Sequence, residues 1–187
     1  HIIPPGVKKE YTETISDESC RTVRKKYGIP EQYILYVGSV EPWKRVPFLI
    51  DSVLRYRRKT GHAIGLVIVG RPGWNADECA TVKTQVGAER DMRWLGYVAQ
   101  EEMAALYHSA ALFVSASTWE GFGLPFIEAM ASGVPVIGAR AAAIPETIGN
   151  AGLLFDAASM DDCAATIERC LRDEALSHQL RERGLKR

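Results

Sequence analysis

Residues 119–130 read WEGFGLPFIEAM, and this stretch decides the fold that we expect. It follows ALFVSAS at 111–117, a short apolar run that is typical of a buried strand. Gly121 and Gly123 allow a sharp turn, and Pro125 is well tolerated in the first turn of a helix. The stretch therefore predicts a strand, a tight turn and a helix that begins at about this proline.

The same alternation of strands and helices runs outward in both directions. Further apolar strands are expected at 33–40, 63–73, 92–98, 134–139 and 151–155. Helical spacing or helix-end residues predict helices at 17–28, 46–61, 75–88, 100–110 and 143–150, and two helical stretches within 159–186. Apolar strands without polar alternation are covered on both faces, as in parallel sheets. The sequence predicts an α/β fold with a doubly wound, Rossmann-like parallel sheet.

In such a sheet the ligand crevice lies at the carboxyl ends of the strands. The loops that follow the predicted strands there are 38–45, 70–76, 96–101, 117–124 and 138–146. Candidate ligand-binding residues are therefore sought in these five loops.

The composition narrows the function classes. The 187 residues suit one domain, and 23 Lys plus Arg balance 23 Asp plus Glu, which gives no net attraction to nucleic acid or anionic membranes. No apolar run reaches the ~20 residues of a transmembrane helix, and no signal peptide is visible. The four cysteines form no CxxC pair, so we expect a reducing cytoplasm and neither a zinc site nor a disulfide framework.

The two ends of the chain suggest an excised domain. The chain begins at His1 and continues directly into IIPPGV, and it stops within the charged helical pattern RERGLKR without a helix stop signal. We expect residues 1–30 to form an interdomain linker and a leading helix, and residues 31–187 to form the domain itself.

The turn at 119–130 combines groups that suit two parts of one ligand. Free N–H groups at a helix start attract anions such as phosphate. The carboxylates of Glu120 and Glu128 flank this position, and ionised carboxylates accept hydrogen bonds from hydroxyl groups. A nucleotide sugar has this layout, with a diphosphate between ribose and sugar. The alternative stays open that Glu128 stabilises a helix dipole and Glu120 is merely solvated.

The loop after the first strand, GSVEPWKRV, adds positive charge at the same edge of the predicted sheet. Lys44 and Arg45 stand at the carboxyl end of that strand, where a diphosphate needs cations. A solvated basic pair is the alternative, although cations are disfavoured at helix N-termini. Two cations at an unfavourable position therefore favour the interpretation that they bind an anionic ligand.

Several motifs together resemble one known family. GSVEPWKR, LGYVAQEEMAALYHSA, STWEGFGLPFIEAMASGVPVI and AIPETIGNAGLLFD resemble the C-terminal, donor-binding domain of the retaining glycosyltransferases of family 4, and IIPPGV resembles the segment that enters it. The resemblance covers about residues 2–187. It implies one half of the two-domain GT-B fold, with an N-terminal acceptor domain that is absent from this sequence.

The resemblance implies roles for individual residues. Glu128 resembles the glutamate that binds the ribose hydroxyls, Glu120 the one close to the donor sugar, and Lys44 the lysine that neutralises the diphosphate. Backbone groups of one segment would hold the sugar hydroxyls and the distal phosphate, namely Gly121, Phe122, Gly123 and Leu124.

One position departs from the family pattern. Many members carry an arginine where this chain has Ser39, which leaves a second phosphate cation in doubt, and Arg45 or Arg71 are candidates to replace it. Tyr97 and Val98 lie where the family contacts the base, mostly through main chain, and Arg71 and Pro72 lie in a loop that could frame the base.

The EPWK loop is similar to a version found in bacterial transferases of polysaccharide assembly, many of them mannosyltransferases. The resemblance thus implies a hexosyltransferase that uses a nucleoside diphosphate sugar, with GDP-mannose favoured, and a glycan or lipid-linked acceptor bound by the absent domain. It implies sugar transfer with retention, and no cofactor or metal is required. Peripheral contact with the inner membrane would involve the absent domain.

Three other functions are alternatives. A glycosidase also uses two carboxylates, but it needs neither an anion-binding helix start nor Lys44. A nucleotide-sugar epimerase can share the GT-B fold, and the EGFGLP loop argues against it. The isolated chain can also be a nucleotide-binding fragment without turnover, and we expect this of the chain by itself.

Overall fold

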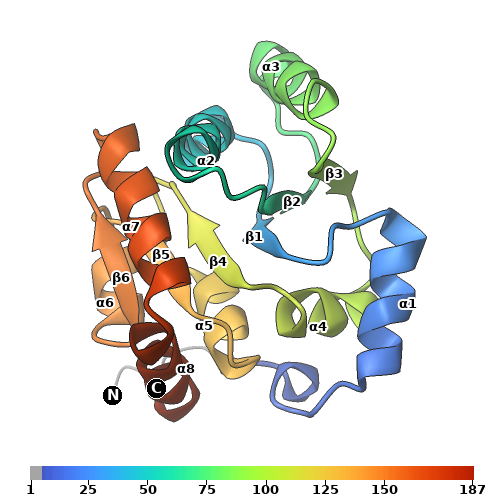
Figure 1. Ribbon diagram of the computed structural model, residues 1–187, viewed down its shortest axis with the longest axis vertical. Helices are drawn as coiled ribbons and strands as arrows, with labels where there is room; N and C mark the ends of the chain where they lie inside the picture. Colours follow the sequence, from blue (N-terminus) through green and yellow to red (C-terminus); the bar gives the residue numbers. More distant parts are fainter. Residues whose placement is uncertain (1–5) are drawn as a thin grey trace.

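The computed structural model describes residues 6–187, so residues 2–5 of the IIPPGV segment lie outside the described residues. A six-stranded sheet forms its centre (Figure 1). The strands are β1 (Tyr33–Val37), β2 (Gly65–Val69), β3 (Met92–Gly96), β4 (Leu112–Ser115), β5 (Val136–Ala139) and β6 (Gly152–Phe155). Their spatial order is β3-β2-β1-β4-β5-β6 with parallel pairings. The predicted doubly wound, Rossmann-like sheet is confirmed, and the order reverses between β1 and β4.

Helices flank the sheet on both faces. They are α1 (Asp17–Tyr27), α2 (Val46–Thr60), α3 (Ala76–Gly87), α4 (Gln100–His108), α5 (Leu124–Ala131), α6 (Ile144–Ile148), α7 (Met160–Arg172) and α8 (Glu174–Lys186), with 3-10 turns η1 (Lys9–Tyr11) and η2 (Pro42–Lys44). Each helix predicted from the sequence is present, with its ends shifted by a few residues.

Side chains of each strand alternate between two cores. In β1, Ile34 and Tyr36 face the core that contains α2, α3 and α7. Tyr33 and Leu35 face the core that contains α1, α4, α5 and α6. Successive side chains of a strand point to opposite faces of the sheet. Because every residue of β1 is apolar, both of its faces can be buried under helices.

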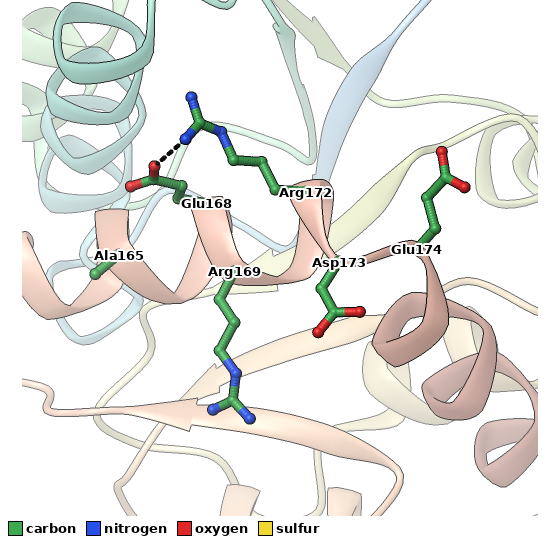
Figure 2. Close-up of a pocket in the computed structure, with 6 residues that line it drawn as sticks. All are labelled: Ala165, Glu168, Arg169, Arg172, Asp173 and Glu174. Atoms are coloured by element: carbon green, nitrogen blue, oxygen red, sulfur yellow. Dashed lines mark ion pairs between the residues drawn. The ribbon is translucent and has the colours of Figure 1, made fainter.

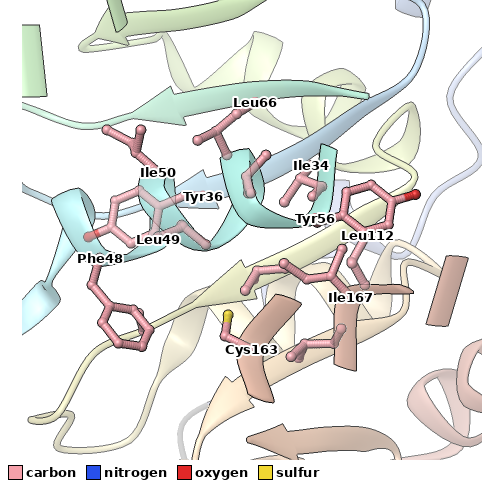
Figure 3. Packing of buried hydrophobic residues seen from close by; sticks show 14 of the residues in the cluster. Ile34, Tyr36, Phe48, Leu49, Ile50, Tyr56, Leu66, Leu112, Cys163 and Ile167 are labelled. Carbon is pink, nitrogen blue, oxygen red and sulfur yellow. The ribbon is translucent and has the colours of Figure 1, made fainter. Parts of the chain in front are cut away.

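The first core is closed by α2 and α7, which lie side by side over the sheet. Figure 3 shows Leu49 of α2 and the two α7 residues Cys163 and Ile167 among the strand side chains. Cys163 and Cys170 lie seven positions apart on the buried face of α7, and both are free thiols.

The described part of the amino-terminal segment packs against the rest of the domain. Helix α1 packs on α4, and Cys20 and Val23 of α1 belong to the second core. Tyr11 of η1 is 2% exposed in the same core. Of the region 1–30 that we expected to be a linker and leading helix, the part from Tyr11 onward thus contributes buried side chains.

Glycines bring the carboxyl ends of the central strands close together. The Gly38 N–H donates to the Val69 carbonyl at 2.9 Å, and the Gly70 N–H donates to the Gly96 carbonyl at 2.8 Å. A Cβ atom on Gly70 would lie 1.9 Å from the Gly38 carbonyl oxygen. The loops after β1 and β2 can therefore start side by side only because this position lacks a side chain.

Within the described residues, no helix has both the length and the apolar character that a membrane crossing demands.

Candidate functional site

Two charged side chains from distant loops meet at the carboxyl edge of the sheet. Lys44 Nζ lies 2.6 Å from Glu120 Oε1, and the two side chains are 17% and 13% exposed. Lys44 ends η2 after β1, and Glu120 follows β4. Because β1 and β4 are neighbours, the strand order alone brings these two loops together. The sequence prediction that both residues serve one site is consistent with this ion pair.

Backbone hydrogen bonds hold these two loops in register. The Thr118 N–H donates to the Trp43 carbonyl at 2.8 Å, and the Thr118 hydroxyl reaches the same oxygen at 3.3 Å. The Ser117 hydroxyl donates to the Trp119 carbonyl at 2.9 Å. The residues directly before Lys44 and Glu120 are thus fixed, so the ion pair rests on a braced backbone rather than on two free loops.

The start of α5 lies directly after Glu120. Gly123 takes the N-cap position with φ 82°, no side chain caps the helix, and Pro125 lies in its first turn. The Thr147 hydroxyl of α6 donates to the Phe122 carbonyl, which fixes the turn before the helix. A helix start without a side-chain cap leaves N–H groups that can bind an anion. The turn at Gly121, Phe122, Gly123 and Leu124 thus leads into an uncapped helix start, and its binding of an anion stays a prediction.

Glu128 lies in α5, and it is partly buried. Its Oε2 accepts a hydrogen bond from the Tyr107 hydroxyl at 2.8 Å. Burial raises the pKa of Glu128 above the usual value, while the Tyr107 hydroxyl and the charge of Lys8 act in the opposite direction. A carboxylate that is held at one oxygen can offer its other oxygen to a ligand hydroxyl.

Tyr107 was not predicted as a site residue, and neither were Tyr11 and Gln100 beside it. Tyr107 reads as one more apolar residue of an amphipathic helix, and Gln100 as the first residue of that helix. The Gln100 amide donates to the Tyr11 hydroxyl at 2.7 Å. One feature of the sequence could have indicated Tyr107: a tyrosine on the buried face of a helix usually has a hydrogen-bond partner for its hydroxyl.

The remaining predicted residues fall into two groups. Arg71 lies over the Tyr97 ring, with its guanidinium carbon 5.1 Å from the ring centre. Both side chains are exposed, so the two loops that we expected near a base are in contact at the surface. Val98 is 4% exposed, so its side chain is covered, and a contact between its main chain and a base stays a prediction.

Arg45 and Ser39 serve the fold in this structure. The Arg45 guanidinium lies 4.1 Å from the Phe48 ring centre and donates to the Ala157 carbonyl in the loop before α7. The Ser39 carbonyl accepts a hydrogen bond from the buried Tyr36 hydroxyl at 3.0 Å. Whether Arg45 replaces a phosphate cation stays a prediction, and its contacts here are structural ones.

Exposed apolar side chains gather at this same edge. Six large apolar residues of the described chain are exposed, and five of them follow β1, β2, β3 or β4: Trp43, Trp74, Tyr97, Trp119 and Leu124. Exposed apolar surface of this kind is typical of places where a ligand or another protein surface packs.

Three surface hollows lie elsewhere. The one in Figure 2, of about 670 Å³, is lined by the end of α7 and the start of α8, where Arg172 and Glu168 pair at 2.9 Å. Two others, of about 350 and 640 Å³, include His62, which precedes β2. None of the donor-binding residues predicted from the sequence lines these hollows. The residues that line them carry charges of both signs. No group of His, Cys, Asp and Glu side chains in residues 6–187 is arranged to hold a metal ion.

Comparison with known proteins adds the family. A family model described as glycosyl transferases group 1 matches residues 20–187. O-antigen chain mannosyltransferase B of Escherichia coli is 36% identical over 171 residues, which cover 91% of this chain and 45% of that protein. Mannosylfructose-phosphate synthase of Agrobacterium fabrum is 30% identical, with 98% of this chain and 42% of that protein covered. The chain spans less than half the length of these two relatives.

Solved structures share the fold. HepE of Anabaena, crystallised with UDP and glucose, matches with a TM-score of 0.82 at 23% identity, over 97% of this chain and 50% of that one. The C-terminal domain of LpcC of Francisella tularensis, a group 1 glycosyl transferase, matches with a TM-score of 0.80 at 24% identity, over 97% and 95% of the two chains.

Proposed function

The chain belongs to the group 1 glycosyl transferases, and from this membership we propose that it binds the sugar donor of a retaining hexosyltransferase. The donor is a nucleoside diphosphate sugar, and the acceptor is a glycan or a lipid-linked glycan. The isolated chain is a donor-binding module, and turnover requires an acceptor-binding domain beside it.

The observation that carries this proposal is the position of Lys44 beside Glu120, next to the start of α5. A diphosphate placed here meets a lysine ammonium on one side and helix N–H groups on the other. The carboxylate of Glu120 would face the hydroxyl groups of the sugar. The ion pair keeps both side chains in place, and a bound donor would exchange it for contacts with phosphate and sugar.

Glu128 would bind the other end of the donor. It lies in the second turn of α5, so a donor whose phosphates sit at the helix start places its ribose toward this side chain. Carboxylate oxygens accept hydrogen bonds from both hydroxyls of a vicinal diol. Arg71 and Tyr97 stand over the loops where the base would lie, and the Val98 main chain would contact the base.

In the transfer step the bond between the anomeric carbon and the diphosphate oxygen breaks. The acceptor oxygen forms the new bond to the anomeric carbon, its proton passes to the departing phosphate oxygen, and negative charge develops on that oxygen as the old bond breaks. Lys44 and the α5 start would stabilise that charge, which is electrostatic catalysis by groups that are already oriented. Retention at the anomeric carbon is carried over from the family resemblance.

GDP-mannose is the proposed donor. Support comes from the relatives, because the E. coli protein is named a mannosyltransferase and the EPWK loop is similar to that group. The acceptor would be held by a second domain of the GT-B type, which would face the surface that carries Trp43 and Trp119.

Calorimetric titration of the chain with GDP, UDP and ADP tests the proposal. Preferential binding of GDP is the expected result and supports a GDP-sugar donor. Preferential binding of UDP would still support a transferase, but it would contradict mannose as the favoured sugar. An intact chain that binds none of the three contradicts a preformed donor site. Product analysis on a protein with both domains would separate sugar transfer from epimerisation.

A further inference from the structure

We infer that Tyr107 is a positioning residue for the donor site, which orients the Glu128 carboxylate toward ribose and keeps it an acceptor. The inference rests on the proposed function, because it assigns the task of a side chain behind the proposed ribose contact. Tyr107 itself touches no donor. Its effect passes through the 2.8 Å hydrogen bond from its hydroxyl to Glu128 Oε2.

The ring of Tyr107 is immobilised on several sides. It is 0% exposed, meets the Tyr11 ring edge to face at 5.4 Å between centres, and lies 6.1 Å from the Phe113 ring. A side chain packed this closely occupies one rotamer. Its hydroxyl is therefore a fixed point from which a hydrogen bond reaches α5.

A fixed donor to one oxygen determines how the carboxylate is presented. Tyr107 is the protein group in the described residues that donates a hydrogen bond to Glu128. With Oε2 engaged, Oε1 is the oxygen that remains for hydroxyl groups of a ligand. Without the tyrosine hydroxyl, rotation about the terminal carbon bond of the glutamate would no longer be restricted, and ordering it would cost binding free energy.

The same bond acts on the charge of Glu128. Burial is the largest influence and raises its pKa, the charge of Glu10 acts in the same direction, and Tyr107 and Lys8 lower it. A protonated carboxyl would carry an O–H and lose acceptor capacity. The Tyr107 hydroxyl therefore opposes the protonation that burial favours.

Tyr11 completes the surroundings of this pair. Burial and the nearby charge of Glu128 raise the pKa of Tyr11 to about 12, so it is neutral at physiological pH. The Tyr11 hydroxyl accepts a hydrogen bond from the Gln100 amide at 2.7 Å, and the same amide donates to Glu10 Oε1 at 3.0 Å. Among the described residues, the hydroxyl that donates a hydrogen bond to Glu128 is that of Tyr107.

The test is Tyr107→Phe, which removes one oxygen and keeps the ring. GDP and its 2′,3′-dideoxy analogue are titrated calorimetrically between about pH 5 and pH 8. Wild-type chain should prefer GDP. In the variant, GDP binding should weaken by roughly three- to tenfold, the effect of one hydrogen bond. The loss should be greatest at the acid end, and the dideoxy analogue should bind as before.

A matched control is Tyr33→Phe. Tyr33 is also 0% exposed in the second core, and its hydroxyl donates to the Leu106 carbonyl of α4 at 2.6 Å, away from Glu128. This variant loses a buried hydroxyl of the same kind, and its preference for GDP should match that of the wild type. Equal weakening of GDP and dideoxy-GDP in Tyr107→Phe would mean a general structural effect and would overturn the inference.

A second readout needs no donor. The carboxyl carbon of Glu128 can be followed by NMR as pH is changed, in wild-type chain and in Tyr107→Phe. The midpoint should move to higher pH in the variant. An unchanged midpoint would overturn the inference while wild-type binding of GDP still supported the proposed function. Absence of any preference for GDP over its dideoxy analogue in the wild type would instead remove the ribose contact, and the inference with it.

Discussion

Lys44 and Glu120 are 76 positions apart in the sequence, and their charged atoms lie 2.6 Å apart at the carboxyl edge of the sheet. Both side chains are largely buried. A buried ion pair gains little over a well-packed apolar pair, because both charges lose their hydration. An arrangement that adds little stability fits the proposed donor site, in which phosphate and sugar hydroxyls would replace each charge as the partner of the other.

The first prediction concerns Lys44→Ala. We expect GDP binding to weaken by about 1.5–3 kcal/mol, as for hydrogen bonds to charged groups, which is roughly 10- to 150-fold. Guanosine, which has no phosphate, should bind nearly as before. Calorimetry with both compounds gives the ratio. Lys83→Ala on the exposed face of α3 is the control. Equal losses for GDP and guanosine would mean that Lys44 supports the fold and not the phosphates.

The fold could be predicted because its signals are local. Short apolar runs, glycine ends and Pro125 in a first turn each mark an element, and parallel strands then order the loops at one edge. The pairing of Lys44 with Glu120 follows from that order. Lys44 follows β1 and Glu120 follows β4, and these two strands pair in the sheet.

Tyr107 and Arg45 show what the sequence could not supply. The Tyr107 hydrogen bond depends on how α4 lies beside α5, and amphipathic spacing says only that a face is buried. Arg45 takes a left-handed backbone conformation with φ 53°, which is uncommon for a residue other than glycine. That conformation directs its side chain to Phe48 and Ala157, and a basic residue in a sequence carries no sign of such a turn.

The second prediction concerns the glycine between the central strands. Gly70→Ala should destabilise the domain by on the order of 2–4 kcal/mol, because its Cβ would overlap the Gly38 carbonyl oxygen, which is backbone and cannot rotate away. Gly61→Ala is a suitable control, since its φ is also positive at 71° but nothing lies within 4 Å of the new atom. It should cost only about 1–2 kcal/mol, the usual cost of a Cβ atom in the left-handed region. Denaturant unfolding measures both, and similar losses would contradict the overlap.

The third prediction is that Glu128→Gln weakens donor binding and stabilises the fold. An amide oxygen accepts hydrogen bonds less strongly than a carboxylate, so GDP should bind several-fold more weakly, by about 1 kcal/mol. The 2′,3′-dideoxy analogue should be unaffected. Calorimetry with the two nucleotides measures the difference, and an equal loss for both would place Glu128 away from ribose.

The stability change in Glu128→Gln should depend on pH. Burial raises the pKa of Glu128 in the folded chain, so the folded state binds this proton more tightly than the unfolded state. The ionised carboxylate therefore costs stability above its folded pKa, and the cost vanishes below its unfolded pKa. The variant should melt at a higher temperature than the wild type at about pH 7, and at nearly the same temperature at about pH 4. Glu101→Gln on the exposed face of α4 controls for the loss of one negative charge.

The fourth prediction separates Arg45 from Lys44. The Arg45 guanidinium is held 4.1 Å from the Phe48 ring centre and by the Ala157 carbonyl, so Arg45→Ala removes a cation–π contact and a hydrogen bond between the start of α2 and the loop before α7. The domain should lose about 1–3 kcal/mol of unfolding free energy. Because its charge is already engaged in the fold, the ratio of GDP to guanosine affinity should stay at the wild-type value. Denaturant unfolding measures the loss of stability, and calorimetry with GDP and guanosine measures the affinity ratio. A folded variant whose affinity ratio drops as it does in Lys44→Ala would make Arg45 the second phosphate cation, in place of the arginine that Ser39 replaces.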